Sequence, residues 1–453
     1  MTRVAIIGAG LSGLVVAHAL RRSLGPAAEI DVYDAADGVG GLLHGVEVAG
    51  RFTDVGAEAF VLRRPEAVDL VAELGLSDQV ESPTGARPAV WSDGRLNPLP
   101  APAWMGIPAS PAAVAGLADD ADLARMAAEP ERPLSWSPGS DCSLGELVAD
   151  RFGPSVVARS VDPMIGGVYS CLAADTGVRA ALPALAELLD RGAPSLTAAV
   201  AALLPPAGAP RTPVFGALRG GYRQLVDALV ASSGAEFRLG ADIDALGEGP
   251  VVAGRPYDAA VVATPAPVAA RQLARVAPRS AAELGEVATA SPAVVALAVD
   301  AATPIPELSG VLAATGEELV RGACANPVKA ITFSSRKWAH YGGADQPHRL
   351  RVSFGRLGEP VTATDAELAT AATAALEEII GRPARLVDSA VARWPQGLPC
   401  YAPGHAERVE TILAGLPPGV ALAGATYRGV GVPACIAQAR GAAAAVVAHL
   451  APG

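Results

Sequence analysis

Three glycines near the start of the chain have the spacing of a site for a phosphate-bearing ligand. Gly8, Gly10 and Gly13 form a GxGxxG pattern directly after the apolar residues 4–7. In such a motif the first glycine permits a tight turn, the second lets the backbone approach a pyrophosphate, and the third packs a helix against a strand. Asp34, about 20 residues further on, is placed to hydrogen-bond ribose hydroxyls. Together these features predict a dinucleotide site rather than a chance glycine-rich turn.

The elements that position this motif follow from the hydrophobic pattern. Residues 4–7 predict a buried parallel strand, residues 14–22 a helix, and residues 29–33 a second strand. Because the helix begins beside the glycines, its free N–H groups and positive dipole end face the phosphates. The residues predicted to bind this end of the cofactor are Gly8, Ala9, Gly10, Leu11, Ser12, Gly13, Asp34 and Ala35.

The other reactive side chains form no catalytic or metal-binding pattern. The cysteines include no CxxC pair, the histidines no HxxxH pair, and the chain has neither a GxSxG motif nor a P-loop. We therefore expect reduced, mostly buried thiols, no metal site, and chemistry supplied by the bound cofactor. The cysteines are Cys142, Cys171, Cys324, Cys400 and Cys435.

Two further glycine-containing segments indicate a cofactor that extends beyond its pyrophosphate. A second glycine pair follows Asp34 closely, and another glycine comes after an expected hairpin. A plain NAD dehydrogenase has no need of them, whereas an extended FAD needs backbone close to its ribityl chain. The alternative is a glycine-rich surface loop. Cofactor contacts are predicted at Gly41, Leu42, Gly56, Ala57 and Glu58.

The end of the chain repeats the pattern of strand, glycine turn and helix. Residues 419–424 predict a strand, residues 429–433 a glycine turn, and residues 434–450 an alanine-rich helix. N–H groups at this turn are placed to stabilise the reduced anionic ring of a flavin, although a purely structural helix start is the alternative. The predicted contacts are Gly424, Val430, Gly431 and Val432.

Composition limits the class of protein. With 453 residues, the chain is expected to form two or three lobes. A net charge of −11 without a basic run argues against a nucleic-acid partner. No window approaches the roughly 18 charge-free apolar residues that a transmembrane helix needs. A cytoplasmic protein is therefore expected.

The middle of the chain predicts a helical lobe followed by a sheet. Helices are expected over residues 112–128, 144–159 and 183–204, and a glycine-led helix over 216–232. The lobe is interpreted as resting on a membrane surface, as a roof over a substrate cavity, or as a plain helical cap. Strands are expected at 236–239 and 241–246, and a strand with a turn behind it at 257–265, then a β-rich region at 291–356 and a helix at 366–380.

Several motifs together resemble one enzyme family. They are DVGAEAF at 54–60, DPMIGGVY at 162–169, TFSSRKW at 332–338, RW at 393–394 with LPCY at 398–401, and GVGVP at 429–433. With the nucleotide motif, they make the chain similar to the oxygen-dependent, FAD-containing protoporphyrinogen and coproporphyrinogen III oxidases of the flavin amine-oxidase superfamily. The resemblance is strongest to the coproporphyrinogen III oxidases of Gram-positive bacteria.

The resemblance implies an α/β fold of three parts. A Rossmann-like FAD-binding domain would comprise residues 1–80, 206–268 and 405–453. A mixed-sheet α+β substrate-binding domain would comprise 81–99 and 269–404. Residues 100–205 would form the inserted helical lobe.

The resemblance also implies a reaction. FAD would take hydride from a porphyrinogen, O2 would reoxidise the flavin to give H2O2, and coproporphyrinogen III is favoured over protoporphyrinogen IX. Downstream enzymes of the haem pathway are expected partners, as is contact with the inner face of the membrane. The alternatives are another flavin amine oxidase or desaturase, and a weakly catalytic paralogue that binds porphyrin or FAD.

Four site residues follow from the resemblance. Arg64 is predicted to bind a substrate propionate, because guanidinium matches carboxylate bidentately, unless it is merely solvated. Tyr169 is expected either to line the cavity or to pack in the lobe. Trp394 resembles the family tryptophan beside the flavin, and Ile243 occupies the position whose backbone meets the adenine in relatives.

Two departures from the family pattern bear on activity. Leu42 stands where the family usually carries Arg or Lys, so a cationic contact near the cofactor phosphates is missing. Residues 171–174 replace a more polar run. Both features place turnover and substrate identity in question more than FAD binding.

Overall fold

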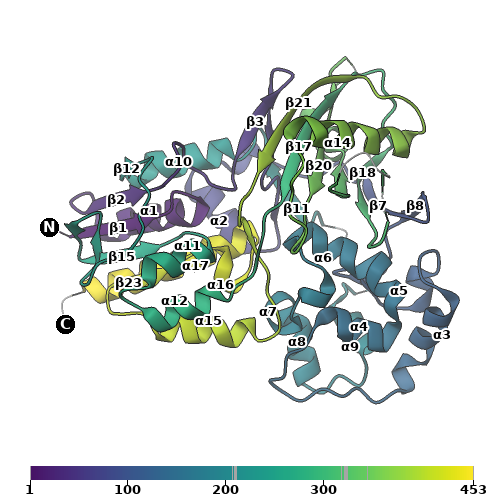
Figure 1. Cartoon of the computed structure of the whole chain (residues 1–453), viewed down its shortest axis with the longest axis horizontal. Helices are drawn as coiled ribbons and strands as arrows, with labels where there is room; N and C mark the ends of the chain where they lie inside the picture. The colour runs from purple at the N-terminus through teal and green to yellow at the C-terminus, as the bar shows by residue number, and fades with distance from the viewer. Residues whose placement is uncertain are drawn as a thin grey trace.

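A five-stranded parallel sheet draws its strands from the beginning, middle and end of the chain. The computed structural model describes residues 2–206, 208, 212–317, 319–320, 325–343 and 345–451; Cys324 lies outside them. Figure 1 shows this sheet beside both termini. Its order is β12 (Glu236–Arg238), β2 (Glu29–Tyr33), β1 (Arg3–Ile7), β15 (Ala259–Val262) and β23 (Val420–Leu422).

Helices cover both faces of this sheet, which explains why its central strands β1 and β15 are almost entirely apolar. Val4 and Ile6 point to one face and Ala5 and Ile7 to the other. The first face packs against α1 (Leu11–Leu24), α2 (Pro65–Glu73), α10 (Arg223–Ser233) and α17 (Val432–Leu450). The second packs against α11 (Ala266–Leu273), α12 (Pro278–Gly285) and α15 (His405–Ala414).

A second, seven-stranded mixed sheet forms the upper right of Figure 1. Val295 and Leu297 pack toward α14 (Asp365–Ile380), whereas Val294 and Ala296 pack toward the hairpin β3–β4. The hairpin comprises β3 (Gly45–Val48) and β4 (Arg51–Asp54). The sheet order is β21 (Leu386–Arg393), β17 (Ala293–Val299), β20 (His348–Phe354), β19 (Val328–Thr332), β18 (Leu308–Ala313), β7 (Arg87–Ser92) and β8 (Arg95–Pro98).

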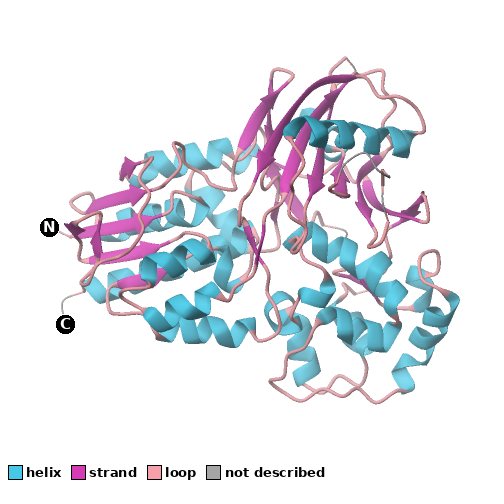
Figure 2. Cartoon of the chain, viewed as in Figure 1, coloured by secondary structure: helices cyan, strands magenta, loops and turns pink. Residues whose placement is uncertain are grey.

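A helical lobe lies below this sheet, as Figure 2 shows. It encloses a hydrophobic core of its own. Among the described residues, no helix combines the length and the apolar character needed to cross a bilayer. The lobe contains α3 (Asp120–Ala128), α4 (Leu144–Phe152), α5 (Pro154–Val156), α6 (Asp162–Tyr169), α7 (Val178–Ala181), α8 (Pro183–Asp190) and α9 (Leu196–Leu203).

Short elements join these three parts. They are β5 (Phe60–Val61), β6 (Val80–Glu81), β9 (Ala103–Trp104), β10 (Ile107–Pro108), β11 (Phe215–Leu218), β13 (Val251–Val252), β14 (Arg255–Pro256), β16 (Thr289–Ala290), α13 (Ser334–Lys337), β22 (Leu398–Pro399) and α16 (Ala425–Arg428).

The structure corrects several predicted elements. Residues 215–218 form strand β11 between β5 and β6, because the positive φ angles of Gly220 and Gly221 delay the helix until Arg223. Residues 241–246 form no strand. Their backbone groups bond elsewhere: Ala241 N–H, for example, donates to the carbonyl of Asp34.

The long helices predicted in the lobe are interrupted. Gly153, with a φ of +99°, and Pro154 end α4 before residue 159. A turn around Gly192 separates α8 from α9. Glycine and proline therefore break helical patterns that hydrophobic periodicity alone would join.

The first prediction concerns a buried ion pair in the lobe. Arg151 Nε donates to Glu129 Oε1 at 2.9 Å, and Glu129 is fully buried. Arg151→Met leaves this carboxylate without its cation, so we expect unfolding free energy to fall by about 3 kcal/mol or more. Urea denaturation measures this change. Arg132→Met, which removes the exposed partner of Asp150, is the control and should cost under about 1 kcal/mol; equal losses would contradict the prediction.

The second prediction concerns Asp54, whose carboxylate accepts a hydrogen bond from Tyr222 N–H at 3.2 Å at the start of α10. Burial raises the pKa of Asp54 to about 7. The folded state therefore keeps the proton that the unfolded chain releases near pH 4. This stabilisation is complete below that pH and is lost as pH rises through 7.

Asp54→Asn removes the ionisable group, so the variant should gain about 3 kcal/mol relative to the parent chain between pH 5 and pH 8. Denaturation curves at the two pH values measure the difference. A gap between variant and parent that stays constant with pH would refute the assignment.

Candidate functional site

Two helix N-termini meet at the carboxyl ends of the parallel strands. Helix α1 begins after Gly10, and α17 begins after Gly431. The two helices pack side by side. Ligands of open α/β sheets bind at this edge, where helix N–H groups favour anions.

The nucleotide glycines have distinct surroundings. A Cβ on Gly13 would lie 1.8 Å from the carbonyl oxygen of Gly8, so this position requires glycine for packing. Gly8 has a φ of +109° and lies against Ala263. A Cβ on Gly10 would meet only Gly41 Cα, at 3.9 Å. Gly10 therefore leaves its outer side open to a ligand, as the motif predicts.

Asp34 holds the glycine loop in place. Its Oδ2 accepts from Ala9 N–H at 2.6 Å and its Oδ1 from Ala36 N–H at 2.8 Å. Ala35, between them, is exposed. Ile243 lies in the irregular segment beside this turn, and its carbonyl accepts from the Gln272 amide at 3.0 Å. The contacts of Asp34 with a ribose and of Ile243 with an adenine stay predictions.

The second glycine pair packs directly on the first loop. Gly40 N–H donates to the Ala9 carbonyl at 2.8 Å, and a Cβ on Gly41 would lie 3.0 Å from Gly10 Cα. A Cβ on Gly56 would lie 1.8 Å from the carbonyl oxygen of Leu42. The three predicted loops are therefore joined by close backbone contacts that side chains would prevent.

Trp394 and Leu42 lie beside Gly397, next to the loops at residues 40–42 and 55–57. Trp394 Nε1 donates to the Val55 carbonyl at 3.1 Å, and its ring meets His44 edge-on at 5.9 Å. A Cβ on Gly397 would touch Leu42 Cδ2 at 3.4 Å and Trp394 Cβ at 2.9 Å. The side chains of Trp394 and Leu42 thus both lie beside Gly397.

Glu58 joins the same loops to the seven-stranded sheet. It accepts from Ser334 Oγ at 2.6 Å and from Lys337 Nζ at 2.8 Å. Burial raises its pKa, but Lys337, Arg351 and these hydrogen bonds outweigh burial and hold it at about 2. The predicted contact of Glu58 with the cofactor stays a prediction.

Arg351 and Lys337 were not predicted as site residues. Arg351 Nη2 donates to the carbonyl of Gly56, inside a predicted cofactor loop. Lys337 belongs to the motif at 332–338, and this motif could have identified it as a site residue. Arg351 stands in no motif, so sequence gave no indication of its role.

The loop at the end of the chain is held by Tyr401. Its hydroxyl donates to the Ala425 carbonyl and accepts from Gly429 N–H, the latter at 2.8 Å. Its ring stacks on His405 at 4.2 Å. Gly424 has a φ of +135°, and no atom lies within 4 Å of a Cβ placed there. These contacts fix the segment that carries Val430, Gly431 and Val432.

The two predicted substrate residues lie in different surroundings. Tyr169 is 7% exposed, its ring lies 5.8 Å from that of Tyr401, and its hydroxyl donates to the Ala181 carbonyl at 3.0 Å. This position favours packing beside the terminal loop. Arg64 is half exposed and binds Glu66 at 2.6 Å. The structure therefore places Tyr169 near the site and leaves Arg64 paired on the surface of α2.

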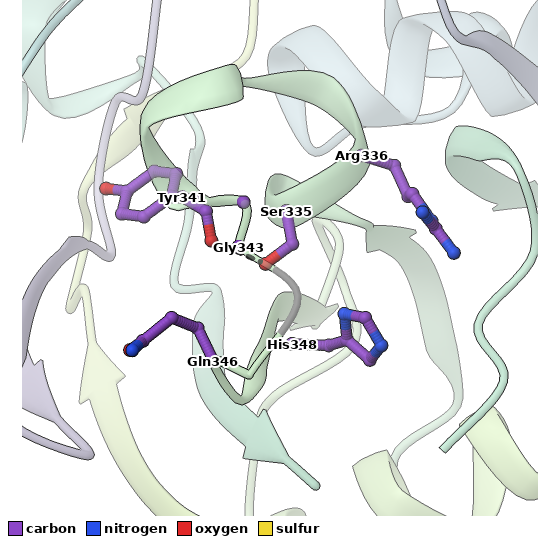
Figure 3. Close-up of a pocket in the computed structure, with 7 residues that line it drawn as sticks. Ser335, Arg336, Tyr341, Gly343, Gln346 and His348 are labelled. Atoms are coloured by element: carbon purple, nitrogen blue, oxygen red, sulfur yellow. Dashed lines mark hydrogen bonds between the residues drawn. The ribbon is translucent and has the colours of Figure 1, made fainter. Parts of the chain in front are cut away.

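A separate cavity of about 280 Å³ lies between α13 and the start of β20 (Figure 3). None of the predicted site residues lines it. Within the described ranges, no group of three metal-ligating side chains lies together. The cavity is lined by Ser335, Arg336, Tyr341, Gly342, Gly343, Gln346 and His348.

Comparison with known proteins agrees with this arrangement. Residues 11–447 match the family described as flavin containing amine oxidoreductase. The chain is 47% identical over 452 residues to the coproporphyrinogen III oxidase of Mycobacterium tuberculosis (strain ATCC 25618 / H37Rv), covering 98% of this chain and 97% of that protein. It is 25% identical to the coproporphyrinogen III oxidase of Bacillus subtilis (strain 168), covering 99% and 98%.

Solved structures give the same result. A crystal structure assigned as a protoporphyrinogen oxidase, from Exiguobacterium sp. 255-15, matches with a TM-score of 0.85 and 26% identity over 99% of both chains. Reduced UDP-galactopyranose mutase shares the fold, with a TM-score of 0.73 and 16% identity over 100% of this chain and 97% of that one. The predicted family and fold class are thereby confirmed: the chain belongs to the flavin-containing amine oxidoreductases, on the branch that includes the coproporphyrinogen III oxidases, and it is an oxidoreductase with a flavin cofactor.

Proposed function

We propose that this protein is an FAD-dependent coproporphyrinogen III oxidase that uses O2 and releases H2O2. The observation that carries the proposal is the 47% identity to a mycobacterial coproporphyrinogen III oxidase over 98% of the chain. Porphyrinogen as the substrate class is supported further by the relatives in Propionibacterium and Bacillus, which carry the same name.

The residues present fit an extended FAD. Gly10 leaves an open approach to the N-terminus of α1, and Gly424 leaves open space near the N-terminus of α17. The loop at residues 40–42 packs on the Gly10 loop and on Gly56. Bound FAD supplies hydride acceptance and reaction with O2. The backbone N–H groups of residues 430–432 would stabilise negative charge on a reduced ring.

The chain's own task is to hold and shield the substrate. The chemistry needs no acid–base group if the cofactor accepts hydride, which agrees with the absence of a catalytic motif in the sequence. Arg64 stays a proposed propionate contact, which would require it to leave Glu66. Contact of the helical lobe with a membrane, a cytoplasmic location and interaction with downstream enzymes also stay proposals.

The direct test uses the flavin-loaded protein. Anaerobic addition of coproporphyrinogen III should bleach the flavin absorption, and aerobic incubation should give coproporphyrin fluorescence well above autoxidation, with three H2O2 formed for each porphyrin. Protoporphyrinogen IX should react more slowly. Bleaching by an amine instead would favour an amine oxidase. Porphyrin binding without H2O2 would favour the weakly catalytic paralogue, for which Leu42 is the supporting feature.

Cofactor binding generates a further prediction. Gly10 has a φ of −72°, so alanine fits its backbone, and a Cβ there meets nothing closer than 3.9 Å. Gly10→Ala should therefore keep the apo-protein folded but weaken FAD binding about tenfold or more, because the methyl group occupies the pyrophosphate approach. Equilibrium dialysis of FAD measures the affinity.

Gly38→Ala is the matched control, since a Cβ there has nothing within 4 Å and Gly38 lies in the same loop region. Its FAD affinity should equal that of the parent protein. Unchanged affinity in Gly10→Ala would show that the cofactor does not approach this glycine.

A further inference from the structure

Two buried cations lie together at one end of the seven-stranded sheet. Lys329 stands in β19 and is 7% exposed; Arg356 follows β20 and is 8% exposed. Val328 pairs with Phe354, so the two strands bring these residues to the same edge. Cations are rarely buried this completely unless they are paired.

Their charges have few protein partners. Lys329 Nζ donates to two neutral oxygens, Ser170 Oγ at 2.6 Å and Gly355 O at 2.9 Å. Within the described ranges, the Arg356 side chain donates a single hydrogen bond, a long one of 3.5 Å from Nη1 to Glu359 Oε2. Among the described residues, no acceptor reaches its buried Nε. A guanidinium with this many unused donors is suited to a carboxylate.

The surrounding charged groups do not neutralise the two buried cations. Burial and the neighbouring Arg356 lower the pKa of Lys329 to about 7, whereas Glu359 and Cys171 act in the opposite direction. Asp162 also lies near Arg356, but its oxygens accept from Ala173 N–H and Thr315 Oγ1, each at 2.8 Å. An added anion would restore the charged form of Lys329.

The cations face α6 and its following turn. A Cβ on Gly166 would lie 3.4 Å from Arg356 Nε, and Ser170, which bonds Lys329, follows the end of the helix. Gly167 is exposed beside Leu312, and Val168 is 40% exposed, so solvent reaches the last turn of α6. A flat apolar molecule can therefore lie along this turn with a carboxylate directed at the cations.

The end of the sheet that carries the two cations packs on the same hydrophobic core as the predicted flavin segment. Leu357 N–H donates to the Ser170 carbonyl at 2.7 Å, and both Leu357 and Val430 pack on the core that contains Tyr169 and Tyr401. Leu357, which follows Arg356, and Val430 of the loop held by Tyr401 thus pack against one hydrophobic core. A carboxylate bound here would belong to a ligand lying between α6 and that loop.

We infer that Arg356 and Lys329 form the binding site for a propionate carboxylate of the porphyrinogen, and so orient the macrocycle toward the flavin. The inference rests on the proposed function, because it takes its ligand from it. The inference assigns carboxylate binding to the buried pair Arg356 and Lys329, whereas the sequence analysis predicted Arg64, which directly precedes α2.

The test compares variants in kinetics and in direct binding. Arg356→Met should raise KM for coproporphyrinogen III about tenfold or more while kcat changes little, because a charge-assisted bond to the substrate is lost. Arg356→Lys keeps the charge and should lie between the parent and the Met variant. Lys329→Met should act in the same direction. Arg385→Met, at an 82% exposed side chain, is the matched control and should equal the parent.

Binding of coproporphyrin III and of its tetramethyl ester, followed by fluorescence quenching, separates this inference from the proposed function. Arg356→Met should weaken binding of the acid about tenfold and leave the ester unchanged. This arm remains decisive if the parent protein binds porphyrin but does not oxidise porphyrinogen, which would refute only the function. Three outcomes would overturn the inference. KM and the affinity for the acid could be unchanged in both Met variants, or the affinities for acid and ester could fall equally. The parent protein could also fail to bind the acid.

If Arg356→Met fails to retain flavin, Arg356→Lys and Lys329→Met decide the question by the same two measurements. Acid-selective weakening in either supports the inference, and parent-like affinity in both overturns it.

Discussion

Close contact of backbone with backbone is the constraint on which the site depends. A Cβ on Gly13 would lie 1.8 Å from the Gly8 carbonyl oxygen, and one on Gly56 would lie equally near the Leu42 carbonyl oxygen. No rotamer change relieves such contacts, because both partners are main chain. The loops around residues 8–13, 40–42 and 56–57 can therefore form one continuous surface only with glycine at these positions.

Ion pairs and hydrogen bonds then connect that surface to the seven-stranded sheet. Glu58 follows the third loop and binds Lys337, while Arg351 donates to the Gly56 carbonyl. These bonds join the loop at residues 56–58 to α13 and to β20 of the seven-stranded sheet, and the burial of Glu58 limits their screening by solvent. The spacing between the predicted cofactor loops and the edge that carries Arg356 is thus set by the same protein contacts that stabilise the fold.

Sequence predicted the parts of this architecture that local pattern encodes. The strand at Glu29–Tyr33 and the glycine loops lie where hydrophobic runs and turn residues indicated. Residues 241–246 are apolar enough for a strand, yet their hydrogen bonds go to other segments. The surroundings of Arg356 could not be predicted for the same reason. They depend on Gly166 and Lys329, which are distant from it in sequence. Long-range packing, rather than residue type, decides such positions.

The strand order also has a consequence for biosynthesis. Strand β1 is made first, yet its neighbour β15 is made after residue 258, and β23 completes the sheet only after residue 419. Helix α17, which packs along α1, follows later still. During most of the synthesis of these residues, β1 therefore lacks one neighbouring strand and α1 lacks its partner helix. Such long sequence separations slow folding and prolong the exposure of apolar surface, which favours aggregation of the nascent chain until α17 has been made.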